Sequence, residues 1–571
     1  MCLIGYHIFL PLYTSYEIII NYGLHPFNIC IEQPILWKYI KIWFIFSYVF
    51  SSFFIANMSF SFFKNFISLF HFSKKKNFKK KKMLHQYHFL SPPSNHLKLL
   101  IGKNMKTEEL IYLPEKSLYQ NILITGTIGT GKTSSAMYPF TKQLIFYECD
   151  NFDKKLGMLI LDVKGNYYEK VIEFAEACHR KEDVIVLELG GKYKYNPLHK
   201  PNLKASILAN RLKTILLLFS KNNSESYWLD EVEKVLSESI KLCRLYNHNY
   251  VTFEELHKLI TIPNYYLEKI NLLRYKFIQN QFSEEDVYNL LSALNFFEKE
   301  FLSLDQRTFS ILKSEITRIT NCFISDYEVL KTFNPSQKDL NFYGFEEVLK
   351  EGKIVVLKMN ISEYSNLSKI IAAYLKLDFQ SDVMTRLARS NDSNFRSVCF
   401  ISDEYSEYCT ETDANFFSQS REAKCINIVA TQSYTSLLNT LNNQAAVNVI
   451  IQNLINKLWL RTDDIFTIET AQKQIGKEEK KKISKSISEN AKETVFSYFT
   501  NSLNSKNSSI SESINTYSQT DFIYDTNFFT QNLQNFTCLA FLSDGYQIIP
   551  PQKISLIPYF QDFNKIINNI N

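Results

Sequence analysis

The chain has 571 residues, more than one hydrophobic core usually holds, so we expect more than one domain. Its 64 basic and 58 acidic residues leave a net charge of +6, and one lysine-rich run at 74–82 (KKKNFKKKK) supplies that surplus, so total charge does not indicate nucleic-acid binding. The ten cysteines form no CxxC pair and have no histidine at metal-ligand spacing, which argues against a disulfide framework and a structural metal.

Two hydrophobic segments near the N-terminus predict a membrane anchor over residues 1–73. Residues 42–63 (IWFIFSYVFSSFFIANMSFSFF) carry no charge, and as a helix they would be about 33 Å long, close to one hydrocarbon core. Residues 3–20 are long enough for a second transmembrane helix, although Pro11 and Glu17 interrupt them. A secretory signal peptide is the alternative for this segment, but its start lacks a basic region.

The lysine run follows residues 42–63 by about ten positions, and basic residues next to a span favour the cytoplasmic side. We therefore expect a basic linker over 74–95 and everything after it in the cytoplasm. The linker is either a solvated connection or a contact with anionic lipid headgroups.

Short apolar runs of strand length alternate with helical patterns after the linker. This alternation predicts a mostly parallel sheet with helices on both faces, an α/β fold. The runs are residues 122–125, 158–163, 184–189, 354–359, 398–401 and 426–430.

A helical insertion divides the α/β domain into residues 96–200 and 346–571. Between 201 and 345 the pattern changes to long amphipathic stretches such as 229–245 and 284–301. Residues 483–525 are rich in Ser, Asn and Thr with few aliphatic residues, which predicts a mobile loop or partly disordered segment. Only 536–549 is typical of strands after it.

A P-loop at 126–133 (GTIGTGKT) follows the first apolar strand, the context that its mechanism requires. In such a loop, glycines let backbone N–H groups surround phosphates, Lys132 neutralises the β and γ oxygens, and the Thr133 hydroxyl binds Mg²⁺. We expect Pro139 to kink or end the following helix early. The predicted nucleotide-binding residues are Gly126, Thr127, Ile128, Gly129, Thr130, Gly131, Lys132, Thr133 and Ser134.

Two predicted strands end in an aspartate that could hold the Mg²⁺. Asp162 is followed by Lys164 and has no acidic neighbour, whereas Asp403 and Glu404 are adjacent and supply a metal ligand and a general base together. We favour the second pair and interpret Asp162 as a sheet-end residue near the nucleotide or substrate. The alternative for Asp403 and Glu404 is an N-cap and a first-turn acid.

Two further residues are candidates for catalysis. Gln432 follows the strand 426–430, where an amide could sense the γ-phosphate. Arg421, in SQSREAK, could complete the site of a neighbouring subunit as an arginine finger, although an exposed helix arginine is the alternative.

Together these residues resemble the type IV secretion coupling proteins, the TraG/TraD-type conjugative ATPases. The resemblance covers most of 100–549 and depends on the order and spacing of five motifs. They are the P-loop with Pro139, LILDVKGNYYE around Asp162, YNPL at 195–198, GKIVVLKM at 352–359, and FISDEYSEY through SREAKCINIVATQSYTSL.

The resemblance implies a RecA-like P-loop NTPase domain with an inserted all-α domain and N-terminal transmembrane helices. It also implies a multi-pass protein of the bacterial cytoplasmic membrane, assembled as a homohexamer, that hydrolyses ATP with Mg²⁺. The expected partners are single- or double-stranded DNA, a relaxase or relaxosome, and channel proteins. Matched by motif, Lys132 and Thr133 bind phosphate, Asp403 and Glu404 are the acidic pair, Gln432 is the sensor and Arg421 the finger.

The sequence also departs from the family pattern. Val163 stands where many relatives have proline, and only residues 21–41 separate the two predicted spans. Two other functions fit the motifs: a chromosome-partitioning DNA translocase, whose usual winged-helix end the tail does not resemble, and a nucleotide-binding membrane docking protein without motor activity.

Overall fold

The computed structural model of the chain describes residues 96–561 apart from 163, 220–225, 280–281, 365, 390–394, 490–493, 498–501 and 506–509, together with Tyr39 and Ile42. The chain divides into two compact units, residues 1–91 and 92–571, and the second holds all the elements that follow. The predicted spans at 3–20 and 42–63 and the basic linker 74–95 lie outside the described residues, apart from Ile42. None of the helices that the structure describes is both long and apolar enough to cross a membrane.

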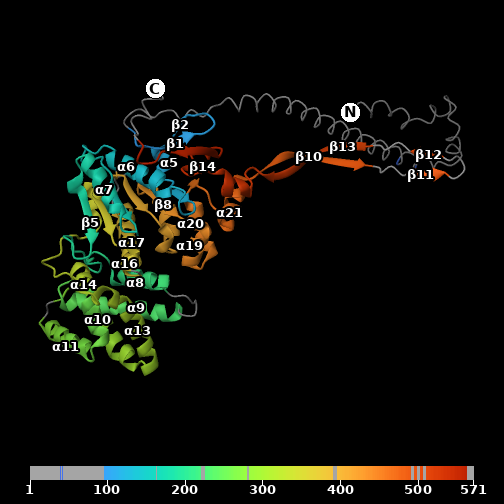
Figure 1. Cartoon of the computed structure of the whole chain (residues 1–571). Coiled ribbons are helices and arrows are strands. Elements are labelled where there is room, and N and C mark those ends of the chain that lie inside the picture. Colours follow the sequence, from blue (N-terminus) through green and yellow to red (C-terminus); the bar gives the residue numbers. More distant parts are fainter. Residues whose placement is uncertain are drawn as a thin grey trace. The chain divides into compact units, whose positions relative to one another are not determined.

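One eleven-stranded sheet forms the centre of the second unit (Figure 1), in the order β2-β1-β15-β14-β9-β3-β8-β7-β4-β6-β5. Its strands are β1 (Lys98–Asn104), β2 (Leu110–Pro114), β3 (Ile122–Thr125), β4 (Gly157–Leu161), β5 (Val184–Glu188), β6 (Ile354–Lys358), β7 (Val398–Ser402), β8 (Cys425–Thr431), β9 (Asn456–Trp459), β14 (Thr537–Phe541) and β15 (Gln552–Leu556).

The strands from β9 to β5 are parallel, and all six predicted runs belong to this part of the sheet. β3, β4, β7 and β8 are buried along their whole length, because helices cover both faces of a parallel sheet and leave no side for water. Hence their sequences are continuous apolar runs. The predicted α/β fold with a mostly parallel sheet is confirmed.

The connections fix where a ligand can bind. From β3 the chain crosses over to β4 and β5, whereas from β6 it returns through β7 and β8 to β9. Since such crossovers are right-handed, the two sets of helices cover opposite faces of the sheet. The connections that leave the neighbouring parallel strands β3 and β8 therefore run across the sheet in opposite directions. Ligands of open α/β sheets bind at the carboxyl ends of the strands at such a reversal.

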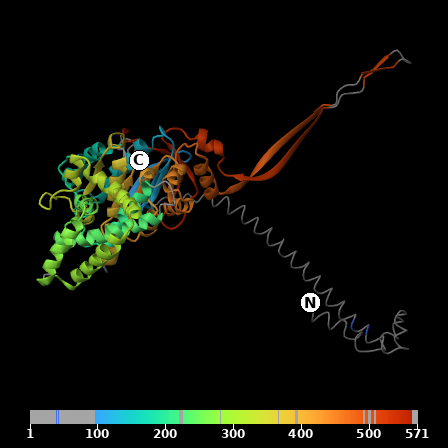
Figure 2. The ribbon, with the colours of Figure 1, turned by 90° about the horizontal axis from the view of Figure 1, so that it is seen from below.

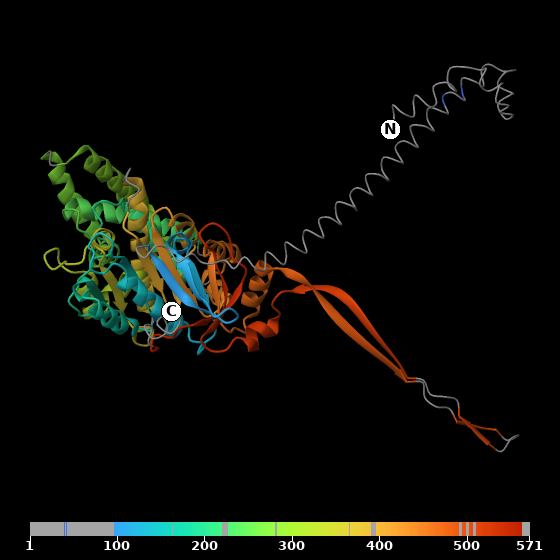
Figure 3. The same ribbon diagram turned by 90° about the horizontal axis from the view of Figure 1, so that it is seen from above.

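Four antiparallel strands extend the other side of the sheet. β14 pairs with β9, β15 with β14, β1 with β15 and β2 with β1. Segments from the two ends of the described chain therefore lie side by side, the blue strands next to the orange and red ones in Figure 3. The sequence predicted strands at 536–549 but neither β1 nor β2.

Helices and short helical turns cover the sheet and connect its strands. They are α5 (Glu115–Leu118), η2 (Thr133–Met137), α6 (Tyr138–Phe146), α7 (Tyr167–Ala177), η3 (Lys181–Asp183), α15 (Glu346–Glu351), α16 (Ile361–Tyr364), α17 (Asn366–Arg389), η7 (Tyr405–Glu407), α18 (Asp413–Gln419), α19 (Tyr434–Leu441), α20 (Gln444–Asn453), α21 (Ile465–Ile475) and η8 (Phe528–Asn532).

The region between β5 and β6 is helical in the part of the chain that the structure describes, and it is drawn in green in Figure 2. Several of its helices begin at sequence-readable caps: Thr252, Ser283 and Asp305 each accept a backbone hydrogen bond from the first turn. Its elements are α8 (Ala205–Phe219), α9 (Ser226–Tyr246), α10 (Phe253–Thr261), α11 (Tyr265–Ile278), α12 (Glu284–Asn295), η5 (Phe296–Glu300), η6 (Phe301–Ser303), α13 (Gln306–Ile324) and α14 (Tyr327–Phe333).

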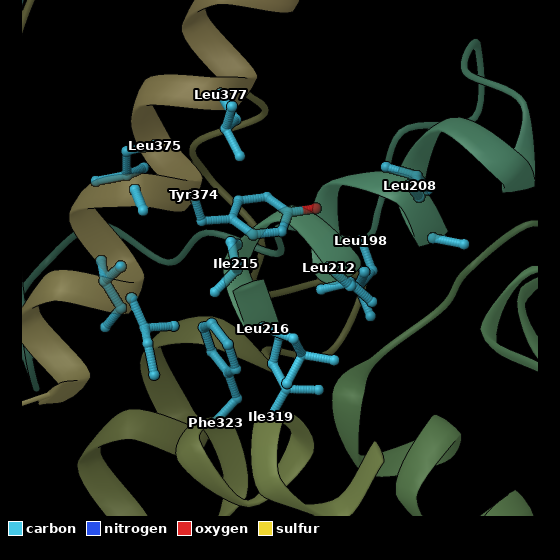
Figure 4. Close-up of a cluster of buried hydrophobic side chains, with 14 of the residues drawn as sticks. Leu198, Leu208, Leu212, Ile215, Leu216, Ile319, Phe323, Tyr374, Leu375 and Leu377 are labelled. Atoms are coloured by element: carbon cyan, nitrogen blue, oxygen red, sulfur yellow. The ribbon is translucent and has the colours of Figure 1, made fainter. Parts of the chain in front are cut away.

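The helical insertion shares one hydrophobic core with the sheet domain. Buried side chains from both form a single cluster, and Figure 4 shows Tyr374 of α17 beside Ile215 of α8, with Phe323 of α13 close by. The Tyr374 hydroxyl donates to the Pro197 carbonyl at 2.8 Å. The insertion is therefore packed onto the sheet domain through α17 rather than connected by a free linker.

The serine- and asparagine-rich segment differs from the prediction. The sequence predicted a mobile loop or partly disordered segment over 483–525. In the residues that the structure describes there, β10 (Lys477–Glu489) pairs antiparallel with β13 (Ile510–Phe522), and β11 (Thr494–Ser497) pairs with β12 (Ser502–Ser505). The long pair is visible as two orange arrows in Figures 2 and 3. These strands were not predicted, because serine and asparagine are uncommon in strands and such a composition indicates a loop. The register of a strand pair depends instead on the alternation of residues along each strand.

Candidate nucleotide-binding and hydrolysis site

The P-loop connects buried β3 to the first helix at the β3/β8 reversal. Gly129 and Gly131 have φ of 80° and 97°, a left-handed conformation that favours glycine. The loop is anchored from neighbouring strands: Gly126 N–H donates to the Thr431 carbonyl at 3.4 Å, and Thr127 N–H donates to the Arg461 carbonyl at 2.9 Å. A side chain at Gly129 would meet no atom within 4 Å, so the loop is open at that point.

Lys132 lies inside the curve of the loop. Its Nζ donates to the carbonyl oxygens of Gly126 at 2.5 Å and Thr127 at 3.3 Å, so the ammonium is held where phosphate oxygens would be neutralised. Burial lowers the pKa of Lys132, and the carboxylates of Glu404 and Asp403 partly offset that effect.

The first helix begins with the π-helical turn η2 before α6. Pro139 has no amide hydrogen to donate one turn back, and the helix widens just before it. The helix nevertheless continues to Phe146, so of the two predicted effects of Pro139, a kink or an early end, the early end is wrong.

Thr133 and Asp403 meet across β8. The Thr133 hydroxyl donates to Asp403 Oδ2 at 2.8 Å, and Asp403, at the end of β7, is buried. A hydroxyl and a carboxylate oxygen are the hard ligands that Mg²⁺ takes from a P-loop protein, with phosphate and water completing its shell. The pair therefore fits a nucleotide-bound Mg²⁺. Among the described residues no cluster of three or more His, Cys, Asp and Glu could hold a metal by itself.

Glu404 is held between two polar partners. Its Oε1 lies 2.8 Å from Lys164 Nζ, and its Oε2 accepts from Gln432 Nε2 at 3.2 Å. Its backbone has φ of 52°, in the left-handed region that non-glycine residues seldom adopt. Such strain persists only where the surroundings enforce it, and it is concentrated at functional sites.

The loop after Glu404 is fixed by a buried ion pair. Lys376 Nζ of α17 lies 2.6 Å from Asp413 Oδ2 and also donates to the Tyr408 carbonyl at 2.9 Å. The Tyr408 hydroxyl in turn lies 2.7 Å from Ser402 Oγ at the end of β7. These contacts orient the chain that carries Asp403 and Glu404.

Lys164 was not among the predicted site residues, although it lies within LILDVKGNYYE. Besides Glu404 it approaches Asp403 Oδ2 at 3.6 Å, and its side chain is 46% exposed. Burial alone would lower the pKa of Lys164, but Asp403 and Glu404 outweigh it and raise the pKa to about 12. The sequence signal was its position two residues beyond a strand-end aspartate.

Asp162 accepts hydrogen bonds from the turn that follows β4. Its Oδ1 accepts the Lys164 N–H at 2.9 Å and its Oδ2 accepts the Tyr167 N–H at 3.3 Å. Burial raises the pKa of Asp162, and the nearby charge of Asp403 adds to the rise. Asp162 thus shapes the turn that presents Lys164, next to the acidic pair.

Arg421 is the one predicted catalytic residue that this chain does not bring to the others. It is exposed in the turn between α18 and β8, at the amino ends of the parallel strands, whereas the P-loop lies at their carboxyl ends. An action of Arg421 on the site of a neighbouring subunit stays a prediction.

Comparison with solved structures gives the fold. The chain resembles the bacterial conjugative coupling protein TrwBdeltaN70 in a trigonal form with sulphate, with a TM-score of 0.53 and 14% identity over 81% of this chain and 94% of that one. It resembles the plasmid coupling protein TrwB in complex with ADPNP, a non-hydrolysable ATP analogue, with a TM-score of 0.52 and 13% identity over the same shares of the two chains.

The unbound monoclinic form of TrwBdeltaN70 gives a TM-score of 0.50 and 15% identity, over 79% of this chain and 89% of that one. No protein-family model matches the sequence, and no curated protein matches it. The three similarities establish the fold, an α/β P-loop fold like that of TrwB.

Proposed function

We propose that this chain is a membrane-anchored ATPase of the type IV secretion coupling protein family. ATP hydrolysis would drive recruitment of relaxase-bound DNA and its movement into a secretion or conjugation channel. The observation that carries the proposal is the convergence of Lys132, the Thr133–Asp403 contact and the Glu404–Gln432 contact at one sheet edge. This convergence occurs on a fold shared with a bacterial conjugative coupling protein, which has also been crystallised with an ATP analogue.

Nucleotide binding follows from the P-loop. Backbone N–H groups of the loop and the start of the helix face the phosphates, and Lys132 supplies a positive charge for the β and γ oxygens. When the charged oxygens enter, Lys132 exchanges its two carbonyl acceptors for them, a stronger charge-assisted hydrogen bond.

Mg²⁺, when bound, withdraws charge from the β and γ phosphates during transfer. Thr133 and Asp403 would hold it, the hydroxyl directly and the carboxylate directly or through its water shell. Asp403 is already oriented toward Thr133, so little rearrangement of the chain is needed.

Glu404 is the group that acts on the attacking water. It accepts the proton as the water oxygen forms a bond to the γ-phosphorus and the bond to the β–γ bridging oxygen breaks, which yields ADP and inorganic phosphate. Lys164 and Gln432 each hold one oxygen of Glu404 and so fix the direction of the carboxylate. Gln432 lies at the end of β8, next to β3, where loss of the γ-phosphate would first change the contacts of the chain.

The proposed assembly is a homohexamer in the bacterial cytoplasmic membrane, anchored by residues 1–73, with the motor in the cytoplasm. In it Arg421 would reach the site of the next subunit, and single- or double-stranded DNA would pass through the central pore. The helical insertion would meet the relaxase, and the channel proteins would receive the DNA.

The decisive experiment compares the full-length chain with its Lys132→Ala variant. We expect ATP turnover that single-stranded DNA stimulates and that the variant loses, together with loss of mobilisable-plasmid transfer in a host that carries the gene. Turnover that is absent from the wild-type chain with and without DNA would instead favour a docking protein without motor activity.

The role of the insertion needs a surface substitution rather than a deletion. Because its core is continuous with that of the sheet domain, removal of 201–345 would expose buried side chains of α17. Tyr288 and Leu291 on α12 are 72% and 57% exposed and lie one turn apart. Replacing both with serine should lower relaxase capture and plasmid transfer while ATP turnover is kept, and unchanged capture would remove the insertion from the proposal.

A further inference from the structure

Three aromatic residues gather at the P-loop: Phe536 and Tyr559 are bonded to it, and Phe560 packs against both of their rings. β14 is antiparallel to β9 and β15 is antiparallel to β14, so β14 begins and β15 ends at the edge where the parallel strands end. Phe536 directly precedes β14, and Tyr559 and Phe560 closely follow β15. The topology thus places residues that are some 400 positions from the P-loop in sequence at the same edge.

Backbone hydrogen bonds attach these residues to the P-loop. Phe536 N–H donates to the Thr130 carbonyl at 3.1 Å, and Tyr559 N–H donates to the Ser134 carbonyl at 2.9 Å. The two segments are also joined, since Leu556 N–H donates to the Phe536 carbonyl at 2.8 Å. Both therefore move with the loop that would hold the phosphates.

The ring of Phe536 lies against the loop itself. A Cβ at Gly131 would lie 2.5 Å from the Phe536 ring, so glycine is required there for close approach as well as for its φ. Phe536 has φ of 61°, a conformation that aromatic residues rarely adopt, and the surrounding hydrogen bonds hold it there.

The rings form a connected but open set. Phe536 and Phe560 have centroids 6.1 Å apart at 76°, and Phe560 meets Tyr559 at 5.6 Å and 77°. Tyr559 packs edge-on against Tyr138 of the first helix at 5.3 Å. Phe560 is nevertheless 63% exposed, so a large apolar ring is held in place beside a polar loop with much of its surface uncovered.

The direction of a bound triphosphate identifies what would cover it. The γ end of the triphosphate faces Asp403, Glu404 and Gln432 on the β8 and β7 side of β3. Its α end, with the sugar and base attached, therefore points to the opposite side, where β9, β14 and β15 follow. The segments that carry Phe536, Tyr559 and Phe560 reach the P-loop from that side, because they directly adjoin β14 and β15.

We propose that Phe560, supported by Phe536 and Tyr559, forms a stacking platform for the base of the nucleotide. This inference rests on the proposed nucleotide site. It adds a binding surface for the base, which is the part of the ligand that the P-loop does not contact. A stack accepts any flat π surface, so it favours the larger purines over pyrimidines and does not separate ATP from GTP.

The test compares ATP with inorganic tripolyphosphate, which has the phosphates without a base. Binding of each, with Mg²⁺, is measured by calorimetry on the full-length chain. We expect Phe560→Ala to weaken ATP binding about 5- to 150-fold, the range for loss of one aromatic stack, and to leave tripolyphosphate binding unchanged. Equal ATP affinity in the wild type and Phe560→Ala would overturn the proposal, as would wild-type binding of tripolyphosphate as tight as that of ATP.

Two variants separate this inference from the proposed function. Lys132→Ala should lose both ligands, and a wild-type chain that binds neither would overturn the nucleotide site itself. Tyr546→Ala is the matched control, because Tyr546 is 80% exposed in the loop at the other end of β14 and β15, where it contacts Lys116. It should change neither affinity.

A fourth variant keeps the test valid if the alanine variant fails to fold. Phe560→Trp retains a larger stacking surface, and its fluorescence should be quenched by ATP and GTP but not by tripolyphosphate. Quenching by single-stranded DNA with none by ATP would assign the platform to a nucleic-acid base and overturn the proposal.

Discussion

Two sets of buried charges in this molecule differ in how completely their partners satisfy them. At the junction of the insertion with α17, Asp378 is fully buried; its oxygens lie 2.7 Å from Arg211 and 2.6 Å from Lys200. The Tyr195 hydroxyl adds a bond at 2.5 Å, so both carboxylate oxygens of Asp378 are paired, and in this sense the set is closed to a ligand.

The candidate nucleotide site also combines lysines with carboxylates, but in an open arrangement. Lys164 pairs with Glu404 but remains 46% exposed, and Lys132 donates to two carbonyls of its own loop. A closed set holds helices together, since loss of one partner leaves a buried charge unpaired. An open set can exchange partners with a charged ligand, so the two should respond differently to substitution.

The largest expected effect is on catalysis. Glu404→Gln should lower ATP turnover about 10²- to 10⁴-fold, because the amide cannot accept the proton of the attacking water. Steady-state turnover and ATP binding measure the two properties, and binding should persist. Glu407→Gln is the control, since Glu407 lies three residues further on and pairs with Lys369 instead. Similar losses in the two variants would contradict the assignment.

The next effect is on stability. Asp378→Ala should lower the free energy of unfolding by about 3–5 kcal/mol, because Arg211 and Lys200 remain buried without their carboxylate. Urea denaturation followed by circular dichroism measures it. Glu469→Ala at the exposed Glu469–Lys473 pair is the control, with an expected change below about 1 kcal/mol. Equal changes would show that the junction is not a closed set.

Asp382 should make stability depend on pH. Burial first, and then the charge of Asp378, raise the pKa of Asp382 to about 6. The folded chain therefore holds this proton more tightly than the unfolded chain, and the free energy of unfolding falls as the pH rises between about 4 and 6.

Asp382→Asn should remove that dependence and stabilise the chain at pH 7 by at most about 3 kcal/mol. Denaturation midpoints at pH 4, 5, 6 and 7 for both chains provide the measurement. Parallel profiles would refute the assignment to Asp382.

The smallest effect concerns the open set again. Gln432→Ala removes the 3.2 Å bond to Glu404 and should slow ATP turnover about 10-fold, the value of one hydrogen bond to a charged group. Gln432→Glu should slow it further, since two carboxylates would then face each other. A Gln432→Glu chain as active as the wild type would show that Glu404 does not act where the structure places it.

Much of the sheet and of the phosphate site could be predicted from sequence. The runs that became β3, β4, β7 and β8 are apolar because these strands are buried on both faces, so their composition alone indicates their burial. The P-loop is a local motif, and Asp403 and Glu404 were chosen over Asp162 because two adjacent acids supply two roles. Lys164 was not predicted, since its position two residues beyond Asp162 is a weak signal and a lysine in a turn is most often solvated.

The tertiary structure decided which distant residues meet. Phe536 reaches the P-loop, and Phe560 reaches Phe536, only because β14 pairs antiparallel with β9 and β15 pairs antiparallel with β14. Nothing in the sequence near residue 130 indicates this pairing. The tertiary structure also placed Arg421 at the opposite edge from Lys132 and joined the insertion to α17 through Asp378.

The sequence by itself predicted the nucleotide site, because phosphate binding needs a short run of particular residues that are contiguous in the chain. It also determined the layered α/β fold, through burial and periodicity. Tertiary structure alone decided the partners of Glu404 and the aromatic side of the loop, since those contacts join separate strands whose pairing is set by topology.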